Sequence, residues 1–265
     1  MEVFARRVSG HKGVPAYLAL PDRKGPTPVV VLLHERYGLV RHTEDLAGRL
    51  ASAGYAVLAP DLFYDHPNLE ALHAGRVTFH PSDREVVEKI EDALTALEGV
   101  PGVDVARLGM IGVCQTGRHP FAWGAVHPLS ACAVFYGAAQ RRDWEVTEAQ
   151  PHGMEGLIAA VPCPVLGIFG EKDHVISIQD VLRFRDALER YCKSYTIRLY
   201  ADAPHGWLND TMPGRYRPHL AALAWQALLD FLQDTLQGAP VDTIQWQFVS
   251  EHHPDYDFGK NVRLE

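Results

Sequence analysis

The sequence predicts an α/β fold, a mostly parallel doubly wound sheet flanked by helices. Apolar runs typical of strands alternate with amphipathic segments along the 265 residues, and this alternation is typical of strands that are each followed by a helix on the sheet. Residues 28–33 are apolar throughout, which indicates a strand buried on both faces of a parallel sheet. Hydrophobic residues make up 47% of the chain, enough for a sizeable core in one domain.

Strands are predicted wherever a short apolar or alternating run lies between turn residues. The first follows a glycine-bearing turn, and the later ones are separated by segments with helical periodicity. The predicted strands span residues 14–20, 28–33, 55–59, 108–111, 165–169 and 196–200. A further run, 243–249, alternates polar and apolar residues and predicts an added strand.

Helices are predicted from their capping residues and apolar periodicity. Thr43 is expected to cap the first helix. Ser82 and Glu85 form a capping box that opens a second helix, because each side chain can bond a backbone N–H of the first turn. Ser177 caps a third helix, and a long helix is expected over residues 219–236.

The expected organisation is one α/β domain over residues 1–240, followed by an extension over 241–265. No internal repeat, low-complexity segment or long linker divides the domain. The extension contains the added strand and then a polar stretch, 250–265. It is expected to pack on the body or on a second subunit, so the protein is predicted to be a monomer or a homodimer.

Composition and charge argue against several kinds of partner. The net charge of −8, without a Lys/Arg cluster, argues against nucleic acid. No apolar run approaches membrane-spanning length, and the first residues lack the apolar segment of a secretory signal. We therefore expect a cytoplasmic protein with no membrane partner. His34–Glu35 and His252–His253 are neighbours in sequence, and adjacent side chains in extended chain point to opposite faces, so no metal is expected, nor any other cofactor.

The segment from Gly112 to Gly117 is the strongest candidate for chemistry. It follows the apolar run 108–111 and precedes a small-residue segment, in the pattern of a strand, a sharp turn and a helix. A Gly-x-nucleophile-x-x-Gly turn holds its central residue strained and exposed above a sheet. That residue is Cys114, and a helix dipole favours its thiolate, which can attack a carbonyl carbon. The other cysteines are expected to be structural thiols in a reducing compartment: Cys132, Cys163 and Cys192.

An acid and a histidine follow in the chain order expected of partners for this cysteine. Asp173 comes just after the predicted strand 165–169, and His205 comes just after 196–200. The order nucleophile, acid, histidine, each after a strand, is that of a hydrolase triad. His205 would deprotonate Cys114 and Asp173 would orient the imidazole. The backbone N–H groups of Gln115 and Arg36 are the expected donors to an oxyanion.

Taken together, these pieces resemble the dienelactone hydrolase family of α/β hydrolases. The resemblance spans residues 34–206 and does not reach the extension. It rests on His34, Glu35 and Gly38, on 59–63, on Gly112, Cys114 and Gly117, on Lys172 and Asp173, and on His205 and Gly206. It implies an α/β-hydrolase fold and hydrolysis of a small-molecule ester or lactone through an acyl-cysteine. It also implies that Glu35 lies near the thiol and influences its ionisation.

The sequence departs from the family pattern at two places. Thr116 stands where a second glycine is usual, and the stretch 207–210 lacks the arginine that would hold the carboxylate of dienelactone. Arg36, Arg76, Arg84 and Arg118 are alternative carboxylate ligands, although the expectation for each is a solvated surface charge. A more apolar, aromatic pocket is therefore predicted, with Tyr37, Tyr64 and Trp207 binding the substrate.

Two alternatives stay open. A cysteine amidotransferase-like or protease-like enzyme also uses a cysteine elbow, but it requires a glutamate close after its histidine, which the sequence from His205 to Trp207 lacks. A non-catalytic α/β scaffold that binds a ligand or partner would instead bury Cys114 and show no unusually reactive thiol.

Overall fold

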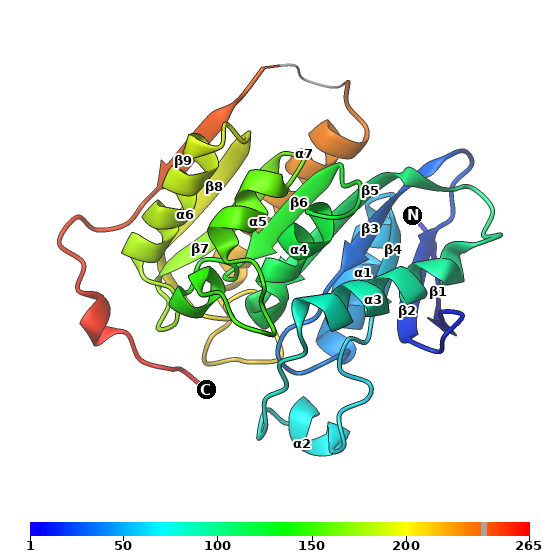
Figure 1. Cartoon of the computed structure of the whole chain (residues 1–265), viewed down its shortest axis with the longest axis horizontal. Coiled ribbons are helices and arrows are strands. Elements are labelled where there is room, and N and C mark those ends of the chain that lie inside the picture. Colours follow the sequence, from blue (N-terminus) through cyan, green and yellow to red (C-terminus); the bar gives the residue numbers. More distant parts are fainter. Residues whose placement is uncertain (240–242) are drawn as a thin grey trace.

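In the computed structural model, which describes residues 1–239 and 243–265, the strands form a single sheet (Figure 1). The strands are β1 (Val3–Ser9), β2 (Pro15–Pro21), β3 (Thr27–Leu32), β4 (Ala56–Pro60), β5 (Val103–Val113), β6 (Ala131–Phe135), β7 (Val165–Lys172), β8 (Tyr195–Pro204) and β9 (Trp246–Ser250). Within the described residues the sheet has nine strands in the order β1-β2-β4-β3-β5-β6-β7-β8-β9. From β4 to β9 every neighbouring pair is parallel, and β2 pairs antiparallel with both β1 and β4. The predicted mostly parallel sheet is therefore confirmed.

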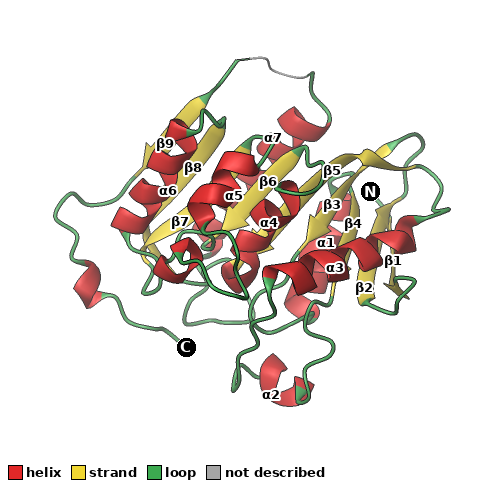
Figure 2. Cartoon of the chain, viewed as in Figure 1, coloured by secondary structure: helices red, strands yellow, loops and turns green. Residues whose placement is uncertain are grey.

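Helices cover both faces of the sheet (Figure 2). They are α1 (Arg41–Ser52), α2 (Leu69–His73), α3 (Asp83–Leu94), α4 (His119–Gly124), α5 (Met154–Ala160), α6 (Ile178–Arg190) and α7 (Pro218–Leu236). Apolar residues of α1 and α7 pack in one core cluster, and those of α3, α4, α5 and α6 pack in another. The sheet lies between the two clusters, so its central strands are buried on both faces.

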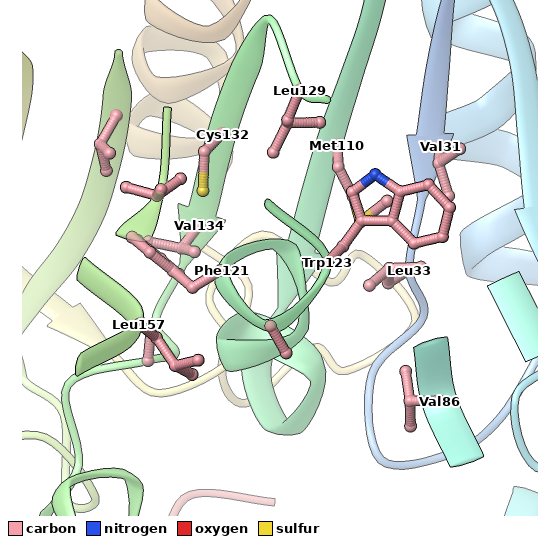
Figure 3. Packing of buried hydrophobic residues seen from close by; sticks show 14 of the residues in the cluster. Val31, Leu33, Val86, Met110, Phe121, Trp123, Leu129, Cys132, Val134 and Leu157 are labelled. Atoms are coloured by element: carbon pink, nitrogen blue, oxygen red, sulfur yellow. The ribbon is translucent and has the colours of Figure 1, made fainter. Parts of the chain in front are cut away.

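Helix α4, which follows the cysteine turn, packs on β5 and β6 through buried apolar side chains. Phe121 and Trp123 of α4 lie among Met110 of β5 and Val134 of β6 (Figure 3). Cys132 belongs to the same cluster, and burial raises the pKa of its thiol well above the usual value. A thiol in this environment stays protonated, as expected of a structural cysteine.

Two of the predicted helix caps are confirmed and one is wrong. Ser82 and Ser177 each form a capping box at the start of α3 and α6. Thr43 does not cap α1, because the N–H groups of Thr43 and Glu44 both bond the carbonyl of Val40. The helix thus begins earlier, and Thr43 is buried within its first turn.

Strands β1 and β6 and helices α2 and α5 were not predicted. Strand β1 is largely exposed and lacks a clear alternation of burial, so it carries little hydrophobic signal. Helices α2 and α5 are short, with five and seven residues, and short helices show too few turns for periodicity to be evident.

The predicted added strand is confirmed as β9, which pairs parallel with β8 and extends the sheet. The predicted domain boundary after residue 240 falls within 240–242, outside the described residues. Beyond β9 the chain makes a wide turn and comes back toward the middle of the molecule (Figure 1). Of the helices in the described part of the chain, none has the length and apolar character needed to cross a bilayer.

Replacing Ser82 tests the cap of α3. The Ser82 hydroxyl accepts a hydrogen bond from the N–H of Glu85 at 3.2 Å. We expect Ser82→Ala to lower the free energy of unfolding by about 1 kcal/mol, because that N–H loses its partner. Urea denaturation would measure the change. Ser82→Thr keeps the cap and serves as the control, and an equal loss in both variants would contradict the assignment.

Candidate active site

The turn after β5 holds Cys114 in a strained conformation. Its φ is +56°, in the left-handed region that non-glycine residues rarely adopt. A Cβ at Gly112 would lie 2.7 Å from the carbonyl oxygen of Thr116, and one at Gly117 would lie 2.6 Å from Cα of Gly137. Both glycines are therefore required by close backbone packing, as a nucleophile turn predicts. Cys114 is partly exposed at its apex.

Thr116, the departure from the glycine pattern, points into the protein. Its hydroxyl is buried, accepts from the N–H of Val113 at 3.1 Å and donates to the carbonyl of His34 at 2.9 Å. The side chain therefore links the turn after β5 to the loop after β3. A five-residue 3-10 turn, Cys114–Arg118, precedes the short helix α4, so the helix start differs from a simple strand-turn-helix.

Cys114, His205 and Asp173 lie in a line of hydrogen bonds. The Sγ atom of Cys114 is 3.0 Å from Nε2 of His205, and Nδ1 of His205 is 2.8 Å from Oδ2 of Asp173. The Asp173 side chain is buried, and its Oδ1 accepts from the N–H groups of Val175 and Ile176 at 2.7 and 3.1 Å. These bonds fix the carboxylate, which in turn fixes the imidazole.

The charges around His205 favour its protonated form. Burial alone would lower the pKa of His205, but the negative charges of Asp173 and Cys114 and the hydrogen bonds to both outweigh burial and hold that pKa well above its usual value. An imidazolium beside the sulfur stabilises the thiolate, which is the nucleophilic form of cysteine.

Glu35 is held in the same cavity by two neutral donors. Its Oε1 accepts from the hydroxyl of Tyr136 at 3.2 Å, and its Oε2 accepts from Nδ2 of Asn209 at 2.6 Å. Burial, and then the charge of Glu35, raise the pKa of Tyr136 well above its usual value. Asn209 lies in the stretch 207–210, which lacks the arginine of the family pattern. Its neutral amide contacts Glu35 and supplies no positive charge.

The proposed oxyanion donors flank the cysteine. Both Arg36 and Gln115 line the cavity that contains Cys114 and His205. The guanidinium of Arg36 is held by the carbonyl of Gly75 at 3.1 Å. Within the described part of the chain, its backbone N–H has no hydrogen-bond partner. The role of both N–H groups stays a prediction.

The cavity above Cys114 has a volume of about 180 Å³ and is rich in arginine. Arg36, Arg142, Arg215 and Arg263 all line it. They come from four segments far apart in the sequence, of which the one with Arg142 is the 3-10 helix Arg141–Trp144, and sequence reasoning identified only Arg36 as a candidate. The spacing of the other three in the sequence carries no motif that relates them to Cys114.

The expectation of an aromatic pocket is wrong in two of its three residues. Tyr37 lines the cavity, whereas Tyr64 and Trp207 are not among its walls. Trp207 is fully buried in the core against Tyr200, because the chain turns inward at Gly206, whose φ is +80°. Tyr64 packs instead beneath the ammonium of Lys89.

The arginines named as alternative carboxylate ligands divide into three kinds. Arg36 reaches the cavity. Arg118 is not solvated and does not line the cavity above Cys114, because it is buried and forms a bidentate ion pair with Asp83 at 2.8 and 2.7 Å. Arg76 and Arg84 are exposed and pair with nearby glutamates. Across the described residues, no group of three His, Cys, Asp or Glu side chains could hold a metal ion.

Comparisons with known proteins agree with the fold. A model of the dienelactone hydrolase family matches residues 14–236. A Yersinia pestis protein, provisionally named a carboxymethylenebutenolidase, is 31% identical over 237 residues, covering 86% of each chain. A Bradyrhizobium protein, provisionally named a 2-oxo-3-(5-oxofuran-2-ylidene)propanoate lactonase, is 28% identical, covering 84% of this chain and 90% of that protein.

Solved structures share the architecture. A Klebsiella pneumoniae protein, provisionally described as a dienelactone hydrolase, is 28% identical with a TM-score of 0.74, and the match covers 88% of this chain and 99% of that one. A puromycin-hydrolysing peptidase of Mycobacterium tuberculosis is 18% identical with a TM-score of 0.68, and the match covers 93% of this chain and 41% of the peptidase. At that identity the second match shows the fold alone.

Alkylation by iodoacetamide at neutral pH tests the state of the thiols. We expect Cys114 to react fastest, because the His205 imidazolium stabilises its thiolate, whereas burial raises the pKa of Cys163 to about 12 and keeps that thiol unreactive. Mass spectrometry of digested protein would give the rate at each cysteine. Exposed Cys192 is the internal control, and a Cys114 slower than Cys192 would contradict an activated thiol.

Replacing Asp173 tests the charge that raises the pKa of His205. In Asp173→Asn the imidazole loses its negative neighbour, so its pKa falls and the imidazolium is lost at a lower pH. The Cys114 thiolate is then stabilised over a narrower pH range. We expect alkylation at pH 7 to slow by at least about tenfold, because a fall of one unit in the pKa of the imidazole changes its protonation equilibrium tenfold. An unchanged rate-against-pH profile would contradict this account.

Proposed function

This chain belongs to the dienelactone hydrolase family, and from that premise we propose that it hydrolyses carboxylate-bearing lactones or esters through an acyl-cysteine on Cys114. The observation that carries the proposal is the line of hydrogen bonds from Cys114 through His205 to Asp173, which opens on an arginine-lined cavity. The names of two relatives, a carboxymethylenebutenolidase and a lactonase, describe substrates of this chemical class.

The proposed reaction begins at the sulfur. The thiolate of Cys114 attacks the carbonyl carbon, and the negative charge moves to the carbonyl oxygen, which the N–H groups of Gln115 and Arg36 stabilise. The tetrahedral intermediate collapses and breaks the carbon–oxygen bond of the ester or lactone. His205 gives its proton to the departing oxygen. In a lactone this opens the ring and leaves one chain attached to sulfur as a thioester.

Water completes the cycle. The neutral His205 takes a proton from water, the resulting hydroxide attacks the thioester carbon, and the carbon–sulfur bond breaks to return Cys114 as thiolate and His205 as imidazolium. Asp173 retains its charge throughout and holds the imidazole. The product is a carboxylic acid, which loses its proton to the solvent and becomes a carboxylate, and, from a lactone, an enol or alcohol on the same molecule.

Glu35 is assigned to control of the thiol. Its carboxylate and Cys114 line the same cavity, and a negative charge there opposes formation of the thiolate. The hydrogen bonds from Tyr136 and Asn209 keep the carboxylate in place without cancelling its charge. The arginines of the cavity are assigned to the carboxylate of the substrate, because a guanidinium binds a carboxylate through two parallel hydrogen bonds.

Hydrolysis of two substrates tests the proposed function. Dienelactone carries a carboxylate and p-nitrophenyl acetate does not. We expect wild type to hydrolyse both and to have the higher kcat/KM for dienelactone. Cys114→Ala is expected to lower kcat/KM for both by about 10³-fold or more, as for other residues that act as the nucleophile.

The control is Cys192→Ala, which removes an exposed thiol far from the proposed chemistry and is expected to match wild type. Turnover that survives in Cys114→Ala would overturn the acyl-cysteine mechanism. Wild-type turnover of the neutral ester alone would keep the mechanism and overturn the carboxylate-bearing substrate. No turnover of either substrate would leave the non-catalytic scaffold as the better account.

A further inference from the structure

The segment 250–265, here called the tail strap, lies beyond the residues matched by the family model, which end at 236. It nevertheless reaches the candidate active site. Arg263 of the tail strap lines the same cavity as Cys114 and His205. The contacts that hold the strap show whether this guanidinium has a defined position.

The tail strap is bonded to the loop that carries the acid. The side-chain amide of Asn261 donates to the backbone carbonyl of Asp173 at 2.8 Å and to that of Glu171 at 3.1 Å. Asn261 lies two residues before Arg263. The strap is therefore tied to the backbone of the proposed triad acid, close to the point where its arginine enters the cavity.

A buried carboxylate gives the tail strap a second anchor. The Glu171 side chain is fully buried, and its oxygens accept from the backbone N–H of His253 at 2.6 Å and from Nδ1 of His253 at 2.9 Å. The N–H of Asp202 is a third donor at 3.4 Å. Because an unsatisfied buried charge is costly, removal of the strap from Glu171 would be unfavourable.

The last residues of the tail strap pack against the loop before α7. The guanidinium of Arg215, another cavity residue, donates to the carbonyl of Leu264. Gly214 leaves room for this contact, because a Cβ there would overlap the backbone of Glu265. Arg263 is thus flanked by anchors on both sides, at Asn261 and at Leu264.

The guanidinium of Arg263 has donors available for a ligand. Its Nε lies 3.0 Å from the carboxylate of Glu265. Within the described residues, its two Nη atoms have no hydrogen-bond partner. Burial lowers the pKa of His174 most, and the positive charges of His205, Arg215 and Arg263 lower it further, which agrees with Arg263 facing the site.

We propose that Arg263 is a specificity-determining residue that binds the carboxylate of the substrate. The anchored tail strap holds the guanidinium of Arg263 in position for this contact. The inference rests on the proposed function for the identity of the substrate. It adds a segment outside the family match to the binding site. The net charge of the chain is −8. Four arginines line one cavity, and they give it a local electrostatic potential opposite in sign to that net charge.

The first experiment compares Arg263→Met with Lys260→Met. Lys260 is on the same tail strap, is exposed, pairs with Asp257 and does not line the cavity, so it controls for the loss of one positive charge. We expect Arg263→Met to lower the ratio of kcat/KM for dienelactone to kcat/KM for p-nitrophenyl acetate by at least about tenfold, mainly through KM, because a charge-assisted hydrogen bond is lost. Lys260→Met should keep the wild-type ratio.

The second experiment measures binding without catalysis. Calorimetry would give the Kd of dienelactone for Cys114→Ala and for Cys114→Ala/Arg263→Met. We expect a Kd at least about tenfold higher in the double variant, with part of the affinity restored by Arg263→Lys, which keeps the charge and loses the planar fork.

The outcomes separate the two proposals. If wild type fails to hydrolyse dienelactone and yet binds it in an Arg263-dependent way, the proposed function falls and the assignment of Arg263 stands. If both Kd values agree within about twofold, or if dienelactone does not bind at all, the assignment of Arg263 is overturned. A Lys260→Met variant with the same loss as Arg263→Met would also overturn it, because the effect would then be general electrostatics.

Discussion

The hydrogen bond between Asp173 and His205 is the interaction on which the rest of the site depends. It joins a buried carboxylate to an imidazole at 2.8 Å, and although burial lowers the pKa of the imidazole, the charge of the acid and the neighbouring Cys114 hold that pKa well above its usual value. In the proposed mechanism, the positive charge of the imidazolium stabilises the nucleophilic thiolate. The acid in turn requires a rigid loop, and both the N–H groups of Val175 and Ile176 and the amide of Asn261 hold that loop.

Both negatively and positively charged side chains lie around this hydrogen bond. Glu35 supplies a carboxylate held by neutral donors, whereas the arginines come from loops far apart in sequence. The arginines attract an anion to the cavity. Glu35 is bonded to neutral groups rather than to one of these arginines. The backbone at Cys114 is strained, with a φ of +56°. The tightly packed glycines on either side of the turn maintain this conformation.

The parts of the molecule that the sequence could predict are those with local signals. Most of the strands and the helix caps at Ser82 and Ser177 were evident from periodicity and capping residues, and the parallel sheet brings the residues after β5, β7 and β8 to one edge. Arg142 and Arg215 could not be found in this way, because loop residues converge only through tertiary packing. Trp207 was misassigned because an aromatic side chain after a turn can face the core or a cavity, and periodicity does not distinguish the two.

The separation between the sheet and the tail strap has a consequence for how this enzyme can diversify. The sheet ends with β9, and beyond it the strap is attached by polar contacts at Asn261 and His253 as well as by the side chain of Tyr256, which packs against the apolar core. A substitution at residue 263 therefore alters the charge of the cavity without disturbing core packing. Selection for a new substrate can therefore act on residue 263 itself, whereas Asn261 and His253 remain tied to the fold through their bonds to Asp173 and Glu171.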